Sequence, residues 1–324
     1  VTAFAQHVPG SSLVVVGDKK TAPSPWRLFV QEHRRAAYLS PEDQRQMQQQ
    51  FRVISLLPWN HFGRKNIGFL YALSNGAQWV FDFDDDNLLH LPIERGLLPD
   101  LLAGRSPATR LVRASSHLYN PYPDFSPVQD GNPVFMWPRG FPLEFVTANE
   151  TFFQSAIEAV DPARVGVFQS LADHNPDVDA IFRLTRTLPV DFARAGAIVA
   201  LAPGVYSPWN AQATLWRGSA LWGSLLPITV PGRVSDIWRS YVVERLLWEV
   251  DRTVAFVSPF VTQYRNAHSY MKDFAEESDL YVKTTPLLAV LSGWTSPARS
   301  ASLADAFIDI YHHLHRADIV GRLD

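Results

Sequence analysis

The sequence predicts an α/β fold with a nucleotide-binding unit near its amino terminus, and three observations carry this prediction. The β-branched run LVVV at residues 13–16 is typical of a buried parallel strand that opens into a polar loop. Residues 67–74 place apolar side chains at helical spacing. Residues 78–81 form a second short apolar run, which leads into three consecutive carboxylates at 84–86. Strand, helix, strand and acids in this order are typical of a unit whose ligand lies at the carboxyl ends of its strands.

Composition sets broad limits on the fold and the partners. The chain has 324 residues, of which 47% are hydrophobic and 19% charged, which is enough for one large α/β domain or two small ones. A net charge of −3 argues against nucleic acid as the main partner, and the lack of cysteine excludes thiolate metal sites and disulfides. No apolar run approaches the ~18 residues of a membrane span. Because the chain begins at Val1 without Met or a signal pattern, we expect it to be the soluble part of an anchored protein.

The loop after the first predicted strand supplies the first candidate ligand contacts. Asp18 and Lys19 follow Gly17 at the end of this strand, where α/β sheets bind ligands. Two interpretations of Asp18 stay open, since it could contact a nucleotide base or ribose, or simply form the turn after Gly17.

The next segment predicts a helix, a strand and a possible phosphate site. Ser40 is a good helix cap, so residues 41–50 are predicted as a polar helix, and residues 51–57 as the second strand. Arg64, Lys65 and Asn66 then cluster at the start of the helix that precedes the acids. Cations there are unfavourable with respect to the helix dipole unless an anion binds. A phosphate site and a solvated loop are the two interpretations.

The rest of the chain is predicted to complete one compact domain. Strands are expected at residues 165–171, within 177–184 and at 253–259, and helices at 232–250, 285–294 and 302–315. Ser235 is the expected cap of the helix at 232–250. The chain has no internal repeat and no low-complexity linker, so we expect a domain over residues 1–282 with a helical extension, residues 283–324, packed on it.

The acids at 84–86 are the strongest candidate metal site. Adjacent carboxylates repel one another, and a divalent cation with hard oxygen ligands makes such a cluster favourable. A second Asp-x-Asp pair, Asp177 and Asp179, precedes a predicted strand and is interpreted as a turn. We therefore expect Asp84 and Asp86 to bind Mn²⁺ or Mg²⁺ together with the diphosphate of a nucleotide-sugar, and Asp85 to contact the nucleotide.

Three further residues are candidates from downstream loops and helices. His268, in a polar loop after the last predicted strand, is the candidate for an additional metal ligand, or a surface histidine. Asp236, in the first turn of the helix at 232–250, is the candidate general base if the reaction inverts the anomeric centre. Its other interpretations are ordinary dipole stabilisation and substrate positioning. Arg233 beside it could clamp a phosphate or pair with Asp236.

Several segments resemble the STELLO family. They are LPWNHFGRKNIG at 57–68, DFDDDN at 82–87, WPRGFPL at 137–143, FQSLAD at 168–173, DVDAIFRLTR at 177–186 and GRVSDIWRSY at 232–241. The resemblance runs from about residue 10 to about residue 285. It implies a GT-A-like fold, with a mixed, mostly parallel central sheet flanked by helices, and an Asp-x-Asp metal site at Asp84–Asp86.

The resemblance also implies a function and a location. It implies a glycosyltransferase that uses a nucleotide-sugar, with a UDP-sugar and an inverting reaction preferred, and a glycan or glycoconjugate acceptor. It implies the Golgi lumen, a type II membrane anchor and association with a polysaccharide synthase complex. Two alternatives stay open: a non-catalytic assembly module that retains the fold, and a sugar-nucleotide mutase, because those enzymes also carry a triple Asp.

Overall fold

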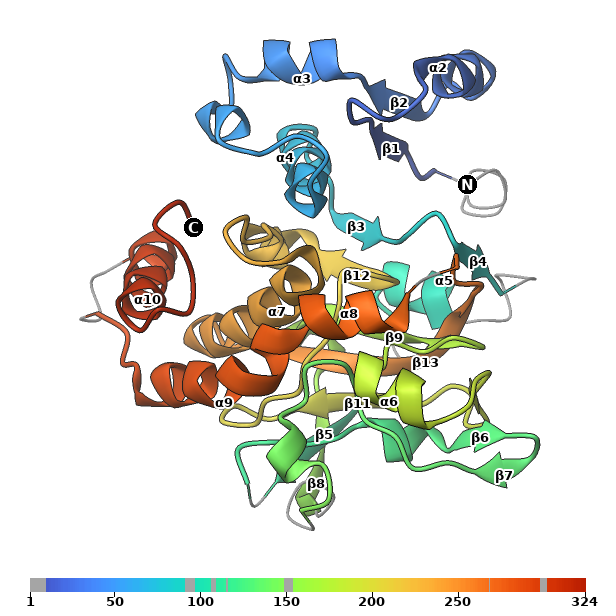
Figure 1. Ribbon diagram of the computed structural model, residues 1–324, viewed down its shortest axis with the longest axis vertical. Coiled ribbons are helices and arrows are strands. Elements are labelled where there is room, and N and C mark those ends of the chain that lie inside the picture. The colour runs from blue at the N-terminus through green and yellow to red at the C-terminus, as the bar shows by residue number, and fades with distance from the viewer. Residues whose placement is uncertain are drawn as a thin grey trace.

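The computed structural model describes residues 10–90, 97–105, 109–114, 116–148, 154–267, 269–297 and 302–324. A small amino-terminal unit stands on one end of a larger body built on an eight-stranded sheet (Figure 1). The expected α/β class, with a mixed central sheet flanked by helices, is confirmed and is consistent with a GT-A-like fold.

The amino-terminal unit is a strand–helix–strand arrangement followed by two helices. Strand β1 (Leu13–Val16) pairs in parallel with β2 (Ala36–Leu39), and α2 (Pro23–Glu32) connects them. Helix α3 (Pro41–Met47) begins at Ser40, whose side chain forms the predicted cap in a capping box. Helix α4 (Asn66–Ser74) follows the short helix η2 (Phe62–Lys65).

The predicted strand at 51–57 is wrong. This segment contains the short helix η1 (Arg52–Ser55), and the second strand is β2 instead. The apolar side chains of this segment are buried without forming a strand, because Ile54 and Leu57 pack in a small cluster with Ile67 of α4. A short apolar run cannot be assigned to strand or helix by periodicity alone.

The central sheet has the order β3-β12-β9-β13-β11-β5-β8, with β4 on the far end of β13. Its strands are β3 (Trp79–Asp82), β4 (Asn87–Leu89), β5 (Thr109–Ala114), β8 (Gln154–Val160), β9 (Val165–Asp173), β11 (Ile198–Leu201), β12 (Thr214–Arg217) and β13 (Thr253–Gln263). The predicted strands at 78–81, 165–171 and 253–259 are confirmed.

The expectation of a mostly parallel sheet is wrong. Only β9–β13 and β5–β11 are parallel among the described strand pairs of this sheet, and the others are antiparallel. Parallel neighbours need a crossover connection, which is usually helical, whereas loops and short helices connect most of these strands. A separate small sheet contains β6 (Pro127–Gln129), β7 (Asn132–Pro133) and β10 (Asp191–Phe192).

Helices cover both faces of the central sheet. Alternate residues of β13 show this directly, because Val254 and Phe256 join the larger core with α7 (Gly232–Glu249), while Ala255 and Val257 face α5 (Leu97–Leu102). Helices α9 (Ser278–Gly293) and α10 (Leu303–Arg316) pack against α7 (Figure 1). No helix in the described parts of the chain combines the length and the apolar character needed to cross a bilayer.

Two local predictions on this side of the molecule need correction. The predicted strand within 177–184 is the helix α6 (Ala180–Thr185), because Asp179 caps it by accepting a hydrogen bond from the Phe182 amide at 2.7 Å. Ser235 does not cap α7, which begins after Pro231; its hydroxyl donates instead to the Pro227 carbonyl at 2.6 Å.

The helix α8 (Tyr270–Glu276) precedes α9, which runs through the expected boundary at 282/283.

Candidate functional site

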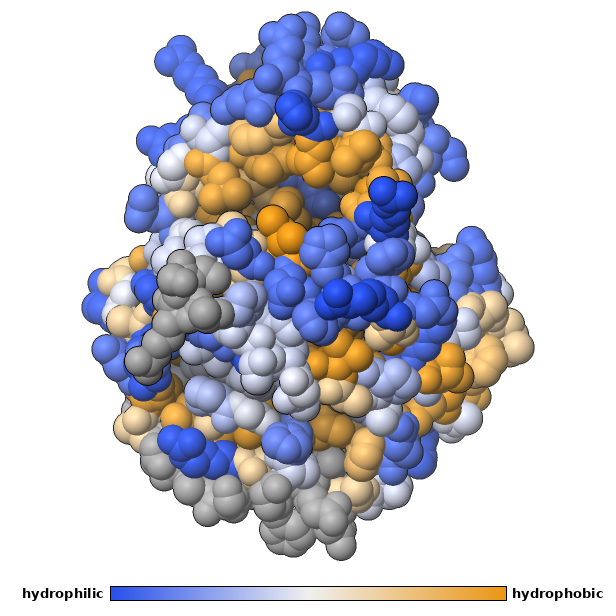
Figure 2. Space-filling model, turned by 90° about the vertical axis from the view of Figure 1, so that its left-hand side faces the viewer, coloured by the Kyte–Doolittle hydropathy of each residue, from blue (hydrophilic) through white to orange (hydrophobic). Residues whose placement is uncertain are grey.

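A cavity of about 870 Å³ lies between the amino-terminal unit and the edge of the central sheet. Its walls come from β1, α4 and β3, and Figure 2 shows its mouth as a hollow with apolar side chains around it. Both β1 and β3 are edge strands, so the cavity lies between the edges of two sheets. The volume lies within the ~300–1,000 Å³ that is typical of small-molecule sites.

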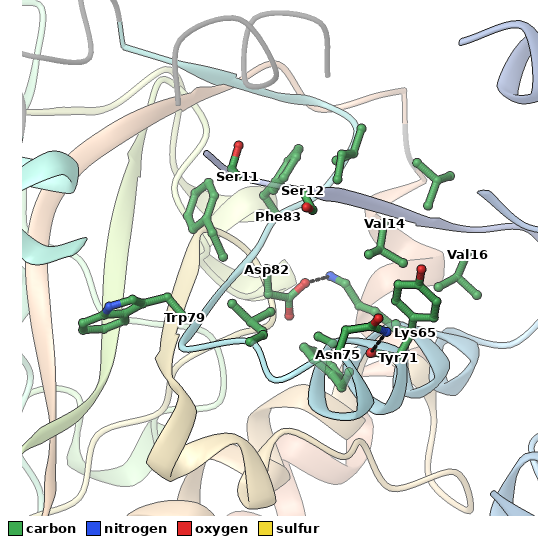
Figure 3. A pocket seen from close by; sticks show the side chains of 18 of the residues that line it. Ser11, Ser12, Val14, Val16, Lys65, Tyr71, Asn75, Trp79, Asp82 and Phe83 are labelled. Carbon is green, nitrogen blue, oxygen red and sulfur yellow. Dashed lines mark hydrogen bonds and ion pairs between the residues drawn. The ribbon is translucent and has the colours of Figure 1, made fainter. Parts of the chain in front are cut away.

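Asp82 lies on a wall of this cavity at the end of β3 (Figure 3). Its side chain is only 4% exposed, and its Oδ1 lies 2.7 Å from Lys65 Nζ. Its Oδ2 is buried and has no hydrogen-bond partner among the described residues. Burial raises the pKa of Asp82 to about 6, although the charges of Lys65 and Arg239 oppose the shift. Asp82 is not among the site residues predicted from the sequence, although its alternation with Asp84 and Asp86 along the chain was a usable signal.

Lys65 is the only one of the three clustered helix-start residues that pairs with the acids in the part of the chain that the structure describes. Its Nζ lies 2.7 Å from Asp82 Oδ1, 3.0 Å from Asp84 Oδ1 and 2.7 Å from the Ala211 carbonyl oxygen. Burial would lower the pKa of Lys65, but the charges of Asp82 and Asp84 and the hydrogen bonds to them raise it above its ordinary value. An ammonium has three N–H donors, so all of them are occupied.

The two sequence neighbours of Lys65, Arg64 and Asn66, make structural contacts and, among the described residues, do not pair with the acids. Arg64 lines the cavity but is buried, stacks on the Trp59 ring at 3.7 Å and donates to the Leu57 carbonyl at 3.1 Å. Asn66 exchanges two hydrogen bonds with the backbone of Leu226, at 2.9 and 2.7 Å.

The acidic loop turns sharply between β3 and β4. The amide of Asp84 donates to Asn87 Oδ1 at 3.2 Å, and the Asn87 amide donates to the Asp84 carbonyl at 3.2 Å. Asp85 is exposed and lines the cavity. These bonds explain why Asn87 follows the acids, since its amide side chain closes the turn.

Asp86 is tied to the end of β13. Its Oδ2 accepts a hydrogen bond from Gln263 Nε2 at 3.2 Å, and its carbonyl accepts one from the Tyr264 amide at 3.2 Å. Its Oδ1 is buried without a hydrogen-bond partner in the described chain. Burial raises the pKa of Asp86 above its ordinary value, against the Gln263 hydrogen bond and with the help of the Asp84 and Asp85 charges.

The acidic loop fits a hard divalent ion in part. Asp86 has a free buried oxygen, and Asp84 is 40% exposed. Within the described residues, however, no three His, Cys, Asp or Glu side chains lie close enough together to hold a metal ion. Mg²⁺ and similar ions need only one or two protein carboxylates when substrate phosphates complete the shell. His268, the expected additional ligand, lies outside the described residues.

The loop after β1 contributes Asp18 to the cavity wall. Asp18 also shapes its own turn, since its amide donates to Thr21 Oγ1 at 2.9 Å and its Oδ1 accepts from the Lys19 amide at 2.6 Å. Lys19 is exposed, with Nζ 5.2 Å from the centre of the Trp59 ring. Both interpretations of Asp18 are thus compatible with its position.

Asp236 lies behind this site and not in the cavity wall. It is 4% exposed and receives a bidentate pair from Arg139, at 3.2 Å to Oδ1 and 2.9 Å to Oδ2. Its Oδ2 also accepts a hydrogen bond from the Ala211 amide at 3.1 Å, and its Oδ1 accepts one from the amide of the next residue, Ile237, at 3.0 Å. In this arrangement no carboxylate oxygen of Asp236 is presented to an acceptor. Arg233, expected to help it, pairs instead with Glu277 and lies 3.7 Å from Asp273.

Ala211 connects Asp236 to the acidic loop. Its amide donates to Asp236, while its carbonyl accepts from Lys65. Arg139 continues the chain of contacts to Asp177, with Nε 2.8 Å from Asp177 Oδ1. The second Asp-x-Asp pair, Asp177 and Asp179, therefore makes structural contacts, since Asp177 pairs with Arg139 and Asp179 caps α6. Sequence patterns could not reveal this connection, because it joins residues that are far apart in the chain.

Comparison with known proteins supports the sequence resemblance. The family model described as STELLO glycosyltransferases matches residues 233–324. The chain is 31% identical over 307 residues to "Probable glycosyltransferase STELLO2" of Arabidopsis thaliana, which covers 89% of this chain and 37% of that relative. It is 30% identical over 307 residues to "Probable glycosyltransferase STELLO1" of the same plant, over 90% of this chain and 37% of the relative. The chain thus spans little more than a third of the curated relatives it matches, and its resemblance to the STELLO family is confirmed.

Proposed function

We propose that this chain is the donor-binding and catalytic part of a glycosyltransferase, and that it transfers a sugar from a nucleotide diphosphate sugar, preferably UDP-linked, to a glycan or glycoconjugate acceptor. The observation that carries the proposal is the cavity of about 870 Å³ beside the acidic loop at the end of β3. The similarity to two probable glycosyltransferases over about nine tenths of the chain supports this reaction class.

The cavity offers an apolar space with polar groups at one side. Val14 and Val16 of β1 and Phe69 of α4 supply apolar surface that suits a nucleobase, while Lys65 and Asp82 mark the polar side. We propose that the diphosphate lies on the polar side near Asp84 and Asp86, with Asp18 and Asp85 available to the nucleoside. Apolar walls exclude water, so charges within the site act more strongly than they would in solvent.

Asp84 and Asp86 are the residues that would hold Mn²⁺ or Mg²⁺. When bound, such an ion stabilises the negative charge that develops on a departing nucleoside diphosphate. The exposed position of Asp84 and the free oxygen of Asp86 support this assignment. We propose Asp236 as a positioning residue that holds Ala211 and, through it, Lys65. An inverting reaction would then take its base from elsewhere in the chain or from the acceptor's surroundings.

A thermal-shift and hydrolysis experiment tests the proposal. Saturation at a hundred times Kd stabilises the native state by ~2.7 kcal/mol, which for a chain of this size corresponds to roughly 4 °C in Tm. We expect UDP with Mn²⁺ to raise Tm by this order, and a screen of nucleotide-sugars with Mn²⁺ to show hydrolysis by the wild type but not by Asp86→Asn. Asp318→Asn is the matched control, because this carboxylate is fully exposed at 103%. No shift and no hydrolysis would reject the proposal.

The contact between Lys65 and Asp84 favours one alternative, a nucleotide-binding module that does not turn over its ligand and serves an assembly. Lys65 already neutralises one of the two proposed metal ligands. This alternative predicts that UDP raises Tm while no nucleotide-sugar is hydrolysed with any divalent metal.

A further inference from the structure

We infer that Lys65 is the internal cation of the acidic site and that a divalent metal ion must displace it from Asp84 in order to bind there. The inference rests on the proposed function in one respect, which is that Asp84 and Asp86 are the metal ligands. It adds that metal binding and the position of Lys65 are mutually exclusive at Asp84.

The geometry shows that Lys65 occupies the site as a bound cation would. Its Nζ has three oxygen partners at 2.7, 3.0 and 2.7 Å, from Asp82, Asp84 and the Ala211 carbonyl. Two of these oxygens belong to Asp82 and Asp84 at the end of β3, and the third belongs to Ala211, which is distant in the chain. The side chain is 22% exposed, so the ammonium is mostly removed from solvent.

The charges explain why the ion and the ammonium exclude each other. Within this contact set, one ammonium faces two carboxylates, and Asp82 is too buried to be neutralised by solvent. A divalent ion on Asp84 would lie beside the ammonium, and like charges at such short distances repel strongly in a partly buried site. Lys65 can keep Asp82 and Ala211 while it releases Asp84, because those two oxygens are buried and Asp84 is the exposed partner at 40%.

After it has lost its contact with Asp84, the Lys65 ammonium can contact a ligand in the cavity. Lys65 lines the cavity and points into the space between β1 and β3, toward Asp82 (Figure 3). A lysine ammonium is an ordinary partner for a phosphate oxygen. The same side chain therefore serves the acids when the site lacks a metal ion and can face an anionic ligand once the ion has taken Asp84.

Binding of Mn²⁺ alone, measured by titration calorimetry without nucleotide, tests this inference. Lys65→Met by itself leaves Asp82 buried and unpaired, so the informative comparison is Lys65→Met/Asp82→Asn against Asp82→Asn, which differ only in the ammonium. We expect the double variant to bind Mn²⁺ at least about tenfold more tightly, because one repelling charge has been removed. Lys65→Arg/Asp82→Asn, which keeps the cation, should stay close to Asp82→Asn.

Several outcomes would overturn the inference. Equal or weaker Mn²⁺ binding in the double variant contradicts it, and so does the absence of Mn²⁺ binding in every variant. A gain that persists after a further Asp84→Asn substitution also contradicts it, since the competition is then not at Asp84. Failure of the proposed function looks different: Mn²⁺ binding responds to Lys65 as expected, but no nucleotide-sugar is bound or hydrolysed.

Discussion

Removal of the Arg139 guanidinium tests whether Asp236 is a structural anchor of the site. The Arg139 side chain is 7% exposed and pairs with the side chains of Asp236 and Asp177, which are 6% and 18% exposed. Arg139→Met leaves both carboxylates without their cation. Breaking a buried ion pair from one side costs about 3–5 kcal/mol, because an uncompensated charge stays buried. Burial and these two carboxylates together set the pKa of Arg139, and the carboxylates prevail and raise it, so the guanidinium stays charged at any ordinary pH.

The double variant Arg139→Met/Asp236→Asn should recover part of this loss. It removes one buried positive and one buried negative charge together, so we expect it to be about 1–2 kcal/mol more stable than Arg139→Met alone. The assay is urea denaturation followed by tryptophan fluorescence. Arg105→Met is the matched control, because Arg105 and Asp100 form an exposed pair, at 71% and 48%, and such pairs are worth less than about 1 kcal/mol.

The same variants separate the positioning role from a general base. A positioning role predicts that Asp236→Asn lowers stability and the rate of nucleotide-sugar turnover while the shape of the pH–rate profile is kept. A smaller loss of stability in Arg139→Met than in the exposed control Arg105→Met would refute the structural role of this ion pair. It is equally refuted if Asp236→Asn abolishes turnover with unchanged stability and removes a limb of the pH profile, because that pattern identifies a base.

Three further predictions concern Asp82, Gly140 (with Gly104 as its control) and Ser40. The pKa of Asp82 is raised from 3.8 to about 6, so the native state binds the proton of this group more tightly than the unfolded state does. The contribution of Asp82 to stability therefore falls by about 3 kcal/mol as pH rises through this window. Asp82→Asn should flatten the plot of unfolding free energy against pH over the same range. Gly140→Ala would place Cβ against Ile237 Cγ2 at φ +82°, closer than van der Waals contact allows, so its thermal unfolding should show a loss of at least about 2 kcal/mol. Gly104→Ala, at φ +71° with no described atom beyond its chain neighbours within 4 Å of the added Cβ, should lose only about 1 kcal/mol. Ser40→Ala should cost ~1 kcal/mol in chemical denaturation, because it removes the cap of α3.

The elements that the sequence predicted well are those with strong local signals. Helix α3 lies where its cap Ser40 placed it, and the helices α4 and α7 and the strands β1, β3 and β9 lie where apolar patterns placed them. The strand predictions at 51–57 and within 177–184 failed for a shared reason. Both runs are short and apolar, and their burial on a neighbouring element decided between helix and strand.

By itself the sequence determined the α/β class, the acidic loop after a strand and the basic start of α4, because each of these depends on neighbours within a few residues. Only the tertiary structure decided which of those groups meet. It brought Lys65 onto Asp82 and Asp84, placed Ala211 between Lys65 and Asp236, and buried Asp236 against Arg139. A hydrogen bond that spans 146 residues of chain, as from Lys65 to the Ala211 carbonyl, depends on how the sheet edge and the amino-terminal unit pack together. Local sequence carries no signal for that packing, and so the cation at the centre of the acidic site could be found only in three dimensions.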